Sequence, residues 1–248
     1  MKQTLNGLPL ALQFFSQIPI RASLPMTKQS VTAMFLFFPL IGLIEGALLY
    51  GISTIVPATF HVILVATLLL LVRMAFTGGL HLDGLADTAD AYFSYGDIAR
   101  RQEILKDPRI GAFGAMAIGM ALLLRVAIYV QVTTAEVSLL YFLMVPVLVR
   151  SGMTLYLIST TPAKASGMAH FFREKFHYGV LTAGHFAWLL AVVLVVPKML
   201  FVAAALLVFL WLFKWWTRKH FGGSSGDMCG AFVEGGELLL WLVLLMFM

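Results

Sequence analysis

Long apolar runs separated by short polar segments dominate the pattern of the chain. A helix needs about 20 apolar residues to cross a bilayer, and several runs reach that length. Because backbone groups in lipid must be hydrogen-bonded within the segment, these runs predict helices and not strands. We expect an all-α fold, a polytopic transmembrane helical bundle that forms one integral membrane domain over residues 1–248. About seven spans are predicted, over residues 31–56, 60–80, 110–132, 137–158, 180–196, 198–216 and 227–248.

The N-terminal segment differs from these runs. Residues 4–18 are apolar but interrupted by Asn6, Pro9 and Gln13. This pattern favours an N-terminal interfacial helix over a span. The segment has no convincing small-residue cleavage site, so we do not expect a removable signal peptide.

Small residues, proline and charges inside the runs predict how the helices pack. Gly42 and Gly46 have the four-residue spacing that lets two helices approach closely, and Gly111, Ala115 and Gly119 repeat it. Pro146 is expected to kink its span. Four charged residues inside spans should face the interior, because an unpaired charge in lipid is costly; they are Glu45, Arg73, Arg125 and Arg150. Glu45 is expected to pair with one of the arginines, and Arg150 is also a candidate phosphate ligand.

Lys and Arg are distributed unevenly across these spans. With the N-terminus in the cytoplasm, thirteen of the 17 fall on the cytoplasmic side, three lie within spans, and only Lys198 is outside. Because cytoplasmic loops carry such an excess of basic residues, we expect a multi-pass protein of the cytoplasmic (inner) membrane. Its long loops and active site should then face the cytoplasm. This arrangement favours an enzyme, and no inverted pair of broken helices, common in transporters, is visible.

Composition agrees with this class and excludes others. Hydrophobic residues make up 60% of the chain and charged residues only 12%. The net charge of +5 comes without interleaved basic and aromatic residues, so no nucleic-acid partner is expected. The single cysteine, Cys229, excludes an intramolecular disulfide.

Acidic residues are scarce, yet three of the twelve lie within eight positions. Asp83, Asp87 and Asp90 are four and three residues apart, so one helix face carries all three. Stacked carboxylates repel one another unless a cation lies between them, and Mg²⁺ prefers such oxygen ligands. The alternative is a solvated acidic helix start, where the helix dipole favours aspartate. His81, just before the first aspartate, is a candidate general base or phosphate-positioning residue, or else a structural histidine.

Two further segments have the composition of ligand-binding sites. Residues 107–114 contain Asp107, Arg109, Gly111 and Gly114 at the start of a span, where a helix N-terminus suits an anionic phosphate. The alternative is an ordinary loop whose arginine lies at the lipid headgroups.

The second segment covers residues 222–237. Gly223 and Gly226 allow the backbone to approach a ligand, and one helix face carries Asp227, Glu234 and Glu237. A structural polar bundle is the alternative. We expect the last span to fold back against the first acidic helix, so that the two acidic faces form one diphosphate–metal site.

Together these three motifs resemble the cobalamin synthase family, also called adenosylcobinamide-GDP ribazoletransferase, over essentially the whole chain. The resemblance implies a Mg²⁺-dependent membrane enzyme in cobalamin biosynthesis. Its substrates would be adenosylcobinamide-GDP and α-ribazole or α-ribazole 5′-phosphate, and its products adenosylcobalamin or its phosphate and GMP. The catalytic residues would be His81, Asp83, Asp87 and Asp90, with metal ligands among Asp83, Asp87, Asp90, Asp227, Glu234 and Glu237. The substrate ligands would be Asp107, Arg109, Gly111, Gly114, Arg150, Gly223 and Gly226.

Other functions remain open at this point. A CDP-alcohol phosphotransferase uses similar chemistry, but its pattern places Ala-Arg two residues after Asp-Gly, whereas here Leu85-Ala86-Asp87 follows Gly84. A membrane transporter usually has its carboxylates at mid-membrane, whereas these lie near cytoplasmic ends. A structural membrane subunit would not need so many acidic motifs. The partners expected are the two substrates and the lipid bilayer. Homo-oligomerisation and association with other corrinoid enzymes are left open.

Overall fold

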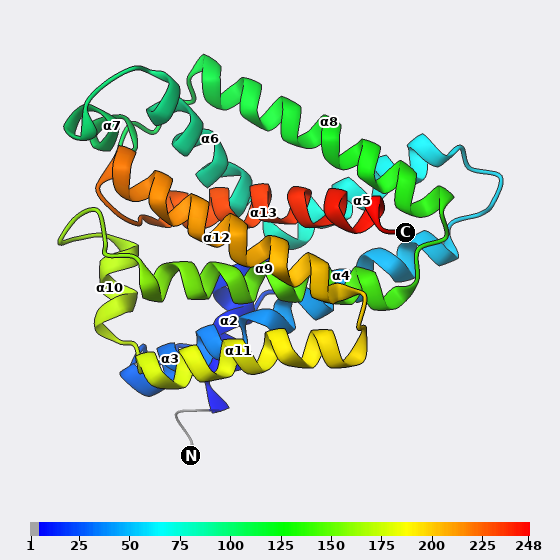
Figure 1. The fold of residues 1–248 in the computed structure, drawn as a ribbon, viewed down its shortest axis with the longest axis horizontal. Helices are drawn as coiled ribbons and strands as arrows, with labels where there is room; N and C mark the ends of the chain where they lie inside the picture. Colours follow the sequence, from blue (N-terminus) through cyan, green and yellow to red (C-terminus); the bar gives the residue numbers. More distant parts are fainter. Residues whose placement is uncertain (1–4) are drawn as a thin grey trace.

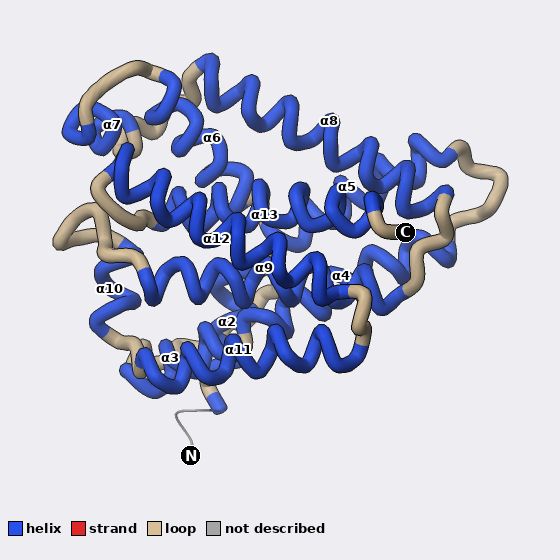
Figure 2. Tube along the Cα trace, in the orientation of Figure 1, coloured by secondary structure: helices blue, strands red, loops and turns tan. Residues whose placement is uncertain are grey.

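The computed structural model describes residues 5–248, which form a bundle of helices without a β-strand (Figure 1, Figure 2). The helices are α2 (Gly7–Phe15), α3 (Lys28–Leu36), α4 (Phe38–Ile55), α5 (Val62–Thr77), α6 (Leu80–Phe93), α7 (Ile98–Ile104), α8 (Ala112–Thr134), α9 (Leu139–Ser159), α10 (Met168–Glu174), α11 (Tyr178–Val195), α12 (Met199–Phe221) and α13 (Gly226–Met246).

The number of spans agrees with the sequence prediction. Six helices or helix pairs in the described part are long and apolar enough to cross a membrane, with α3 and α4 counted as one span. Helices α5 and α6 form a seventh candidate that bends by 91°. The helix predicted over about 60–80 is present as α5, but it ends at Thr77, and the chain bends there into α6. Gly78 and Gly79 end α5 with left-handed φ values of 65° and 76°, which side chains disfavour.

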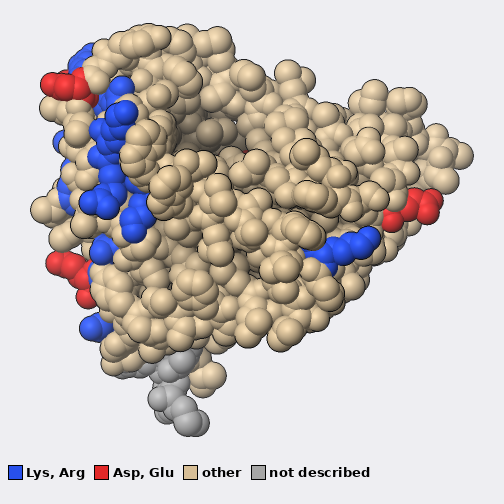
Figure 3. Space-filling model, in the orientation of Figure 1, with Lys and Arg blue, Asp and Glu red and all other residues tan. Residues whose placement is uncertain are grey.

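The two ends of the bundle differ in charge. The short connections after α4, α8 and α11 lie at one end, and α7 and α10 lie at the other (Figure 1). Lys and Arg gather at the α7 and α10 end in Figure 3. Helix α12 continues through Arg218, Lys219 and His220 at this end, although the sequence predicted a connection there. Basic residues in the last turn suit the negative end of a helix dipole.

Helices α4 and α9 pack closely at Gly42 and Gly46, the two glycines for which the sequence predicted a close helix contact. Gly42 lies against the backbone of Pro146, and Gly46 lies against the carbonyl of Phe142. Pro146 has no N–H group, so α9 lacks the hydrogen bond that this residue would otherwise donate to the carbonyl of Phe142. Gly46 on α4 can therefore approach that carbonyl closely. This confirms the close approach expected for Gly42 and Gly46. The equivalent expectation for Gly119 on α8 is wrong, because nothing lies within 4 Å of a Cβ at that position.

Helix α2 confirms the short N-terminal helix. Its buried face contains Leu10, Ala11 and Phe15 and packs against α3 and α4. The start of the predicted segment, residue 4, lies outside the described residues.

Candidate active site

The first acidic helix and the last span pack closely, as the sequence predicted. A Cβ at Gly84 of α6 would lie 2.5 Å from the carbonyl oxygen of Asp227 on α13. One at Gly230 of α13 would lie 3.0 Å from the carbonyl oxygen of His81. Two glycines thus let the backbones of α6 and α13 meet, and the meeting point is where the aspartates lie.

Gly84→Ala should therefore destabilise the protein and lower its activity. Overpacking a close contact costs about 1–3 kcal/mol, and here the added methyl group meets backbone atoms that cannot rotate away. Gly119→Ala is the matched control, because that glycine faces open space on α8. Thermal unfolding of both variants in detergent checks the prediction. A melting temperature of Gly84→Ala equal to that of the wild type would contradict it.

Three carboxylates lie together without a basic partner. Asp83 is exposed, and Asp87 and Asp227 are half-buried. Asp87 experiences repulsion from Asp83, Asp227 and Asp90, and Asp227 also experiences it from Asp83. Within residues 5–248 none of these three forms an ion pair, and the hydroxyl of Ser225 donates to Asp227 at 3.2 Å. We refer to Asp83, Asp87 and Asp227 as the aspartate cluster.

The donor chemistry of the aspartate cluster fits a hard divalent cation. Mg²⁺ is commonly held by one or two carboxylates together with substrate phosphates and water. No three His, Cys, Asp or Glu side chains in the described part converge on one point. Substrate oxygens would therefore have to complete the coordination shell.

Asp90 has a different role from its neighbours on the helix. It is buried, and it accepts hydrogen bonds from the backbone N–H groups of Gly111 at 2.7 Å and Gly114 at 2.8 Å. These contacts anchor the N-terminus of α8 on α6. The predicted role of Gly111 and Gly114 in substrate binding is corrected: their N–H groups bind Asp90.

Asp107 and Arg109 pair with each other outside the site. The guanidinium donates to the carboxylate at 2.8 and 2.6 Å, and Arg109 is 85% exposed. These hydrogen bonds hold the pKa of Asp107 at about 2. Neither residue lines a cavity at the aspartate cluster, so the structure does not bring the two into the predicted substrate site.

Six buried charges form a second cluster deeper in the bundle. Arg73 donates to Glu234 at 2.9 Å and to Glu237 at 3.2 Å, and Arg125 donates to the same two carboxylates at 2.8 and 3.0 Å. Glu45 pairs with Arg150 and, at 3.1 Å, with Arg73. We refer to these residues as the arginine–glutamate cluster, whose members are Glu45, Arg73, Arg125, Arg150, Glu234 and Glu237.

This cluster confirms one prediction and corrects two. Glu45 pairs with arginine, as expected. Glu234 and Glu237 do not share a metal site with the aspartates, because all four of their carboxylate oxygens accept from arginine. Arg150 is likewise bound to Glu45 and is not free for phosphate.

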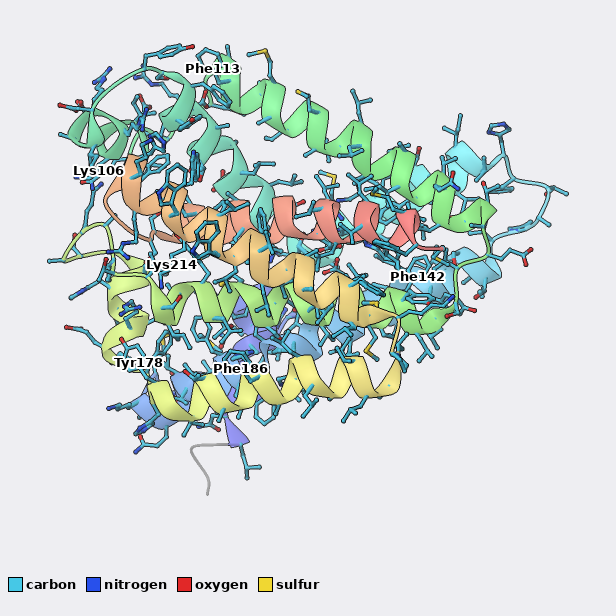
Figure 4. The ribbon with its side chains drawn as sticks, viewed as in Figure 1. Lys106, Phe113, Phe142, Tyr178, Phe186 and Lys214 are labelled. Carbon is cyan, nitrogen blue, oxygen red and sulfur yellow. The ribbon has the colours of Figure 1, made fainter. Side chains whose placement is uncertain are left out.

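Two cavities adjoin the aspartate cluster and share Met168, Ala169, Gly226 and Asp227. The first, of about 200 Å³, is mainly apolar; besides Phe14, Phe15, Phe35 and Phe172 it is lined by His81, Asp83 and Asp227. The second, of about 270 Å³, also has a largely apolar lining but carries two lysines; Lys106, Lys164, Ser225 and Asp227 line it. We call them the aromatic cavity and the basic cavity. Lys106 lies at the end of the bundle that carries α7 (Figure 4).

Gly223 and Gly226 of the third motif have different surroundings. Gly226 lines both cavities, as expected of a residue near a ligand. Gly223 instead lies against the carbonyl of Thr161, where residues 161–163 and Ser224 exchange backbone hydrogen bonds. Gly223 thus packs against the connection of residues 161–163 and lines neither of the two cavities.

Sequence reasoning missed most of the cavity lining. Lys106 and Lys164 were counted only for orientation, and the phenylalanines were not considered. The available signal was that Phe14–Phe15 and Phe171–Phe172 are doublets in short helices flanked by polar residues. Nothing local indicates that α2 and α10 meet.

Comparison with known proteins gives a consistent result. The family model described as Cobalamin-5-phosphate synthase matches residues 7–245. A Geobacillus kaustophilus protein named adenosylcobinamide-GDP ribazoletransferase is 38% identical over 253 residues, covering 98% of this chain and 97% of that protein. Proteins of the same name from Pseudomonas aeruginosa and Clostridioides difficile are 35% and 32% identical, over 98% and 96% of this chain and 99% and 97% of theirs. No solved structure matches the chain.

Proposed function

The chain belongs to the cobalamin-5-phosphate synthase family, and we propose from this that it is itself an adenosylcobinamide-GDP ribazoletransferase. The proposed substrates are adenosylcobinamide-GDP and α-ribazole or its 5′-phosphate. The 3′-hydroxyl oxygen of the ribazole forms a bond to the phosphorus nearest the cobinamide. The bond from that phosphorus to the oxygen bridging to GMP breaks, and GMP leaves.

The observation that carries the proposal is the position of the aspartate cluster between two unlike cavities. A phosphoryl transfer brings together an acceptor hydroxyl and a charged donor, and its catalysis rests mainly on positioning and charge stabilisation. The aromatic cavity provides room for an apolar group, and the basic cavity has two lysines for a diphosphate. Asp227 lies at the wall that the two cavities share.

The side chains supply proton transfer and charge. Asp83 lines the aromatic cavity and has no ion pair among the described residues, so its carboxylate can accept the proton of the attacking hydroxyl. Lys106 and Lys164 attract the diphosphate and the departing GMP. Asp87 and Asp227 would hold Mg²⁺ together with substrate phosphate oxygens, and the ion would neutralise developing phosphate charge.

The location of the reaction follows from the distribution of charge. Basic residues gather at the α7 and α10 end in Figure 3, which is also where Lys106 and Lys164 line the basic cavity. Under the positive-inside rule this end faces the cytoplasm. The proposed enzyme thus works on the cytoplasmic side of the inner membrane.

The test is GMP release by the purified protein in lipid nanodiscs. With adenosylcobinamide-GDP and α-ribazole, we expect GMP and adenosylcobalamin in equal amounts. EDTA should stop the reaction and excess Mg²⁺ should restore it, because the three carboxylates of the aspartate cluster form no ion pair within the described residues. Release of no GMP in the presence of Mg²⁺ would contradict the proposed activity. Undiminished release in EDTA would contradict only the metal dependence.

A further inference from the structure

Four phenylalanine rings form a closed set at the aromatic cavity. Phe14 and Phe15 come from α2, Phe35 from α3 and Phe172 from α10. Each ring contacts two others edge to face, with centroids 4.8 Å (14–15), 5.8 Å (15–35), 5.1 Å (35–172) and 5.3 Å (172–14) apart. Edge-to-face packing fixes ring orientation, so this wall presents a preformed aromatic surface.

The opposite part of the cavity is polar. Asp83 and Asp227 lie there, together with His81. The Nε2 atom of His81 is buried and does not reach the cavity surface, and the charged groups that act on His81 are Arg150, Glu234, Arg73 and Glu237 of the arginine–glutamate cluster. The carboxylates of Asp83 and Asp227 are therefore the charged groups that a ligand in this cavity would meet.

We propose that the aromatic cavity binds the base and ribose of α-ribazole, with the base against the four phenylalanines and the ribose toward Asp83 and Asp227. This assignment rests on the proposed function and specifies which cavity takes which substrate. A ribose hydroxyl would donate a hydrogen bond to the carboxylate of Asp83, which forms no ion pair among the described residues. The same orientation brings the attacking hydroxyl to the aspartate cluster.

Size and polarity exclude the other parts of the substrates from this cavity. A cavity of about 150 Å³ holds a benzene ring. At about 200 Å³ the aromatic cavity suits a fused two-ring base but not a corrin macrocycle. Guanine is of similar size, but its edge carries several donors and acceptors that the phenylalanines would leave unsatisfied. The base of α-ribazole, a dimethylbenzimidazole, has an apolar methylated edge.

The experiment measures the KM for α-ribazole and the KM for adenosylcobinamide-GDP separately in each variant. Phe14 is half-buried, so Phe14→Ala removes a ring from the cavity with less risk to folding than the buried rings. Loss of one stacking partner should raise the KM for α-ribazole about tenfold, with the KM for adenosylcobinamide-GDP within twofold of wild type. Leu80→Ala, at a 40% exposed residue that lines this cavity and not the basic cavity, provides a second variant if the first is unstable. Phe186→Ala, on the outer α11 helix (Figure 4), is the matched control and should change neither constant.

Direct binding keeps this proposal separate from the proposed activity. Titration of α-ribazole alone into the wild type in nanodiscs should show binding that Phe14→Ala weakens about tenfold and Phe186→Ala does not. If the wild type releases no GMP but binds α-ribazole in this way, the activity fails and the cavity assignment stands. A raised KM for adenosylcobinamide-GDP with that for α-ribazole unchanged would overturn the assignment. So would competition between GDP and α-ribazole for the same site.

Discussion

Replacing Asp83 with asparagine should reduce GMP release by more than about a hundredfold, the loss expected when a preorganised charged group at a reacting centre is removed. The side chain keeps its shape and loses its charge. Asp83 is exposed and forms no ion pair in the described structure, so the free energy of unfolding should change by no more than about 0.5 kcal/mol. The measurement is kcat with both substrates saturating, alongside thermal unfolding of the same preparation.

Glu103→Gln is the matched control for this variant. Glu103 is an exposed acid on α7 at the same end of the bundle, and it pairs only with the exposed Arg100. An exposed pair contributes little, so both activity and stability should match the wild type. Full turnover by Asp83→Asn would remove Asp83 from the chemistry and leave the aspartate cluster without its proposed role.

Replacing Arg125 with methionine should have the largest effect on stability. Arg125 is buried and donates to Glu234 and Glu237. Methionine fills similar space but leaves two buried carboxylates short of one partner each. Breaking a buried pair in this way costs about 3–5 kcal/mol. Denaturant unfolding in mixed micelles measures the loss, and Arg100→Met at the exposed pair should cost less than about 1 kcal/mol.

A second substitution distinguishes loss of pairing from loss of packing. Adding Glu237→Leu to Arg125→Met removes one of the stranded carboxylates, so the double variant should be more stable than the sum of the single effects predicts. Strict additivity would mean that Arg125 acts through its shape. Wild-type stability of Arg125→Met would mean that the arginine–glutamate cluster does not hold the bundle together.

The sequence predicted which helix face carries a side chain better than how far that side chain lies from the aqueous end of the bundle. Asp227 and Glu234 are seven residues apart and share a helix face, as expected. Seven residues also advance a helix by about 10 Å, which moves Glu234 into the bundle, away from the aqueous end. There Arg73 from α5 and Arg125 from α8 reach it. Which arginines lie at that depth depends on the packing of helices far apart in sequence, and no local pattern contains it.

Asp90 is a second case in which local spacing did not predict the partner of a side chain. Its spacing from Asp87 predicts a shared face, and the two do lie on one helix. Its carboxylate is occupied by α8, because the N–H groups at the N-terminus of that helix need hydrogen-bond acceptors. The connection through α7 brings these N–H groups within reach of Asp90. By contrast, the spans followed from hydropathy, which repeats along one helix, and the contact of α6 with α13 was expected because each carries an acidic face.

The arginine–glutamate cluster also has a consequence for how the protein is made. Its members belong to α4, α5, α8, α9 and α13, which leave the ribosome in that order. Until α13 arrives, Glu45 is the one acid of this cluster that is present with its three arginines, so the cluster carries two unmatched positive charges in the membrane. Glu234 and Glu237 enter last and supply the missing charges, so assembly of the charged interior and delivery of Asp227 to the active site are the same late event in biosynthesis.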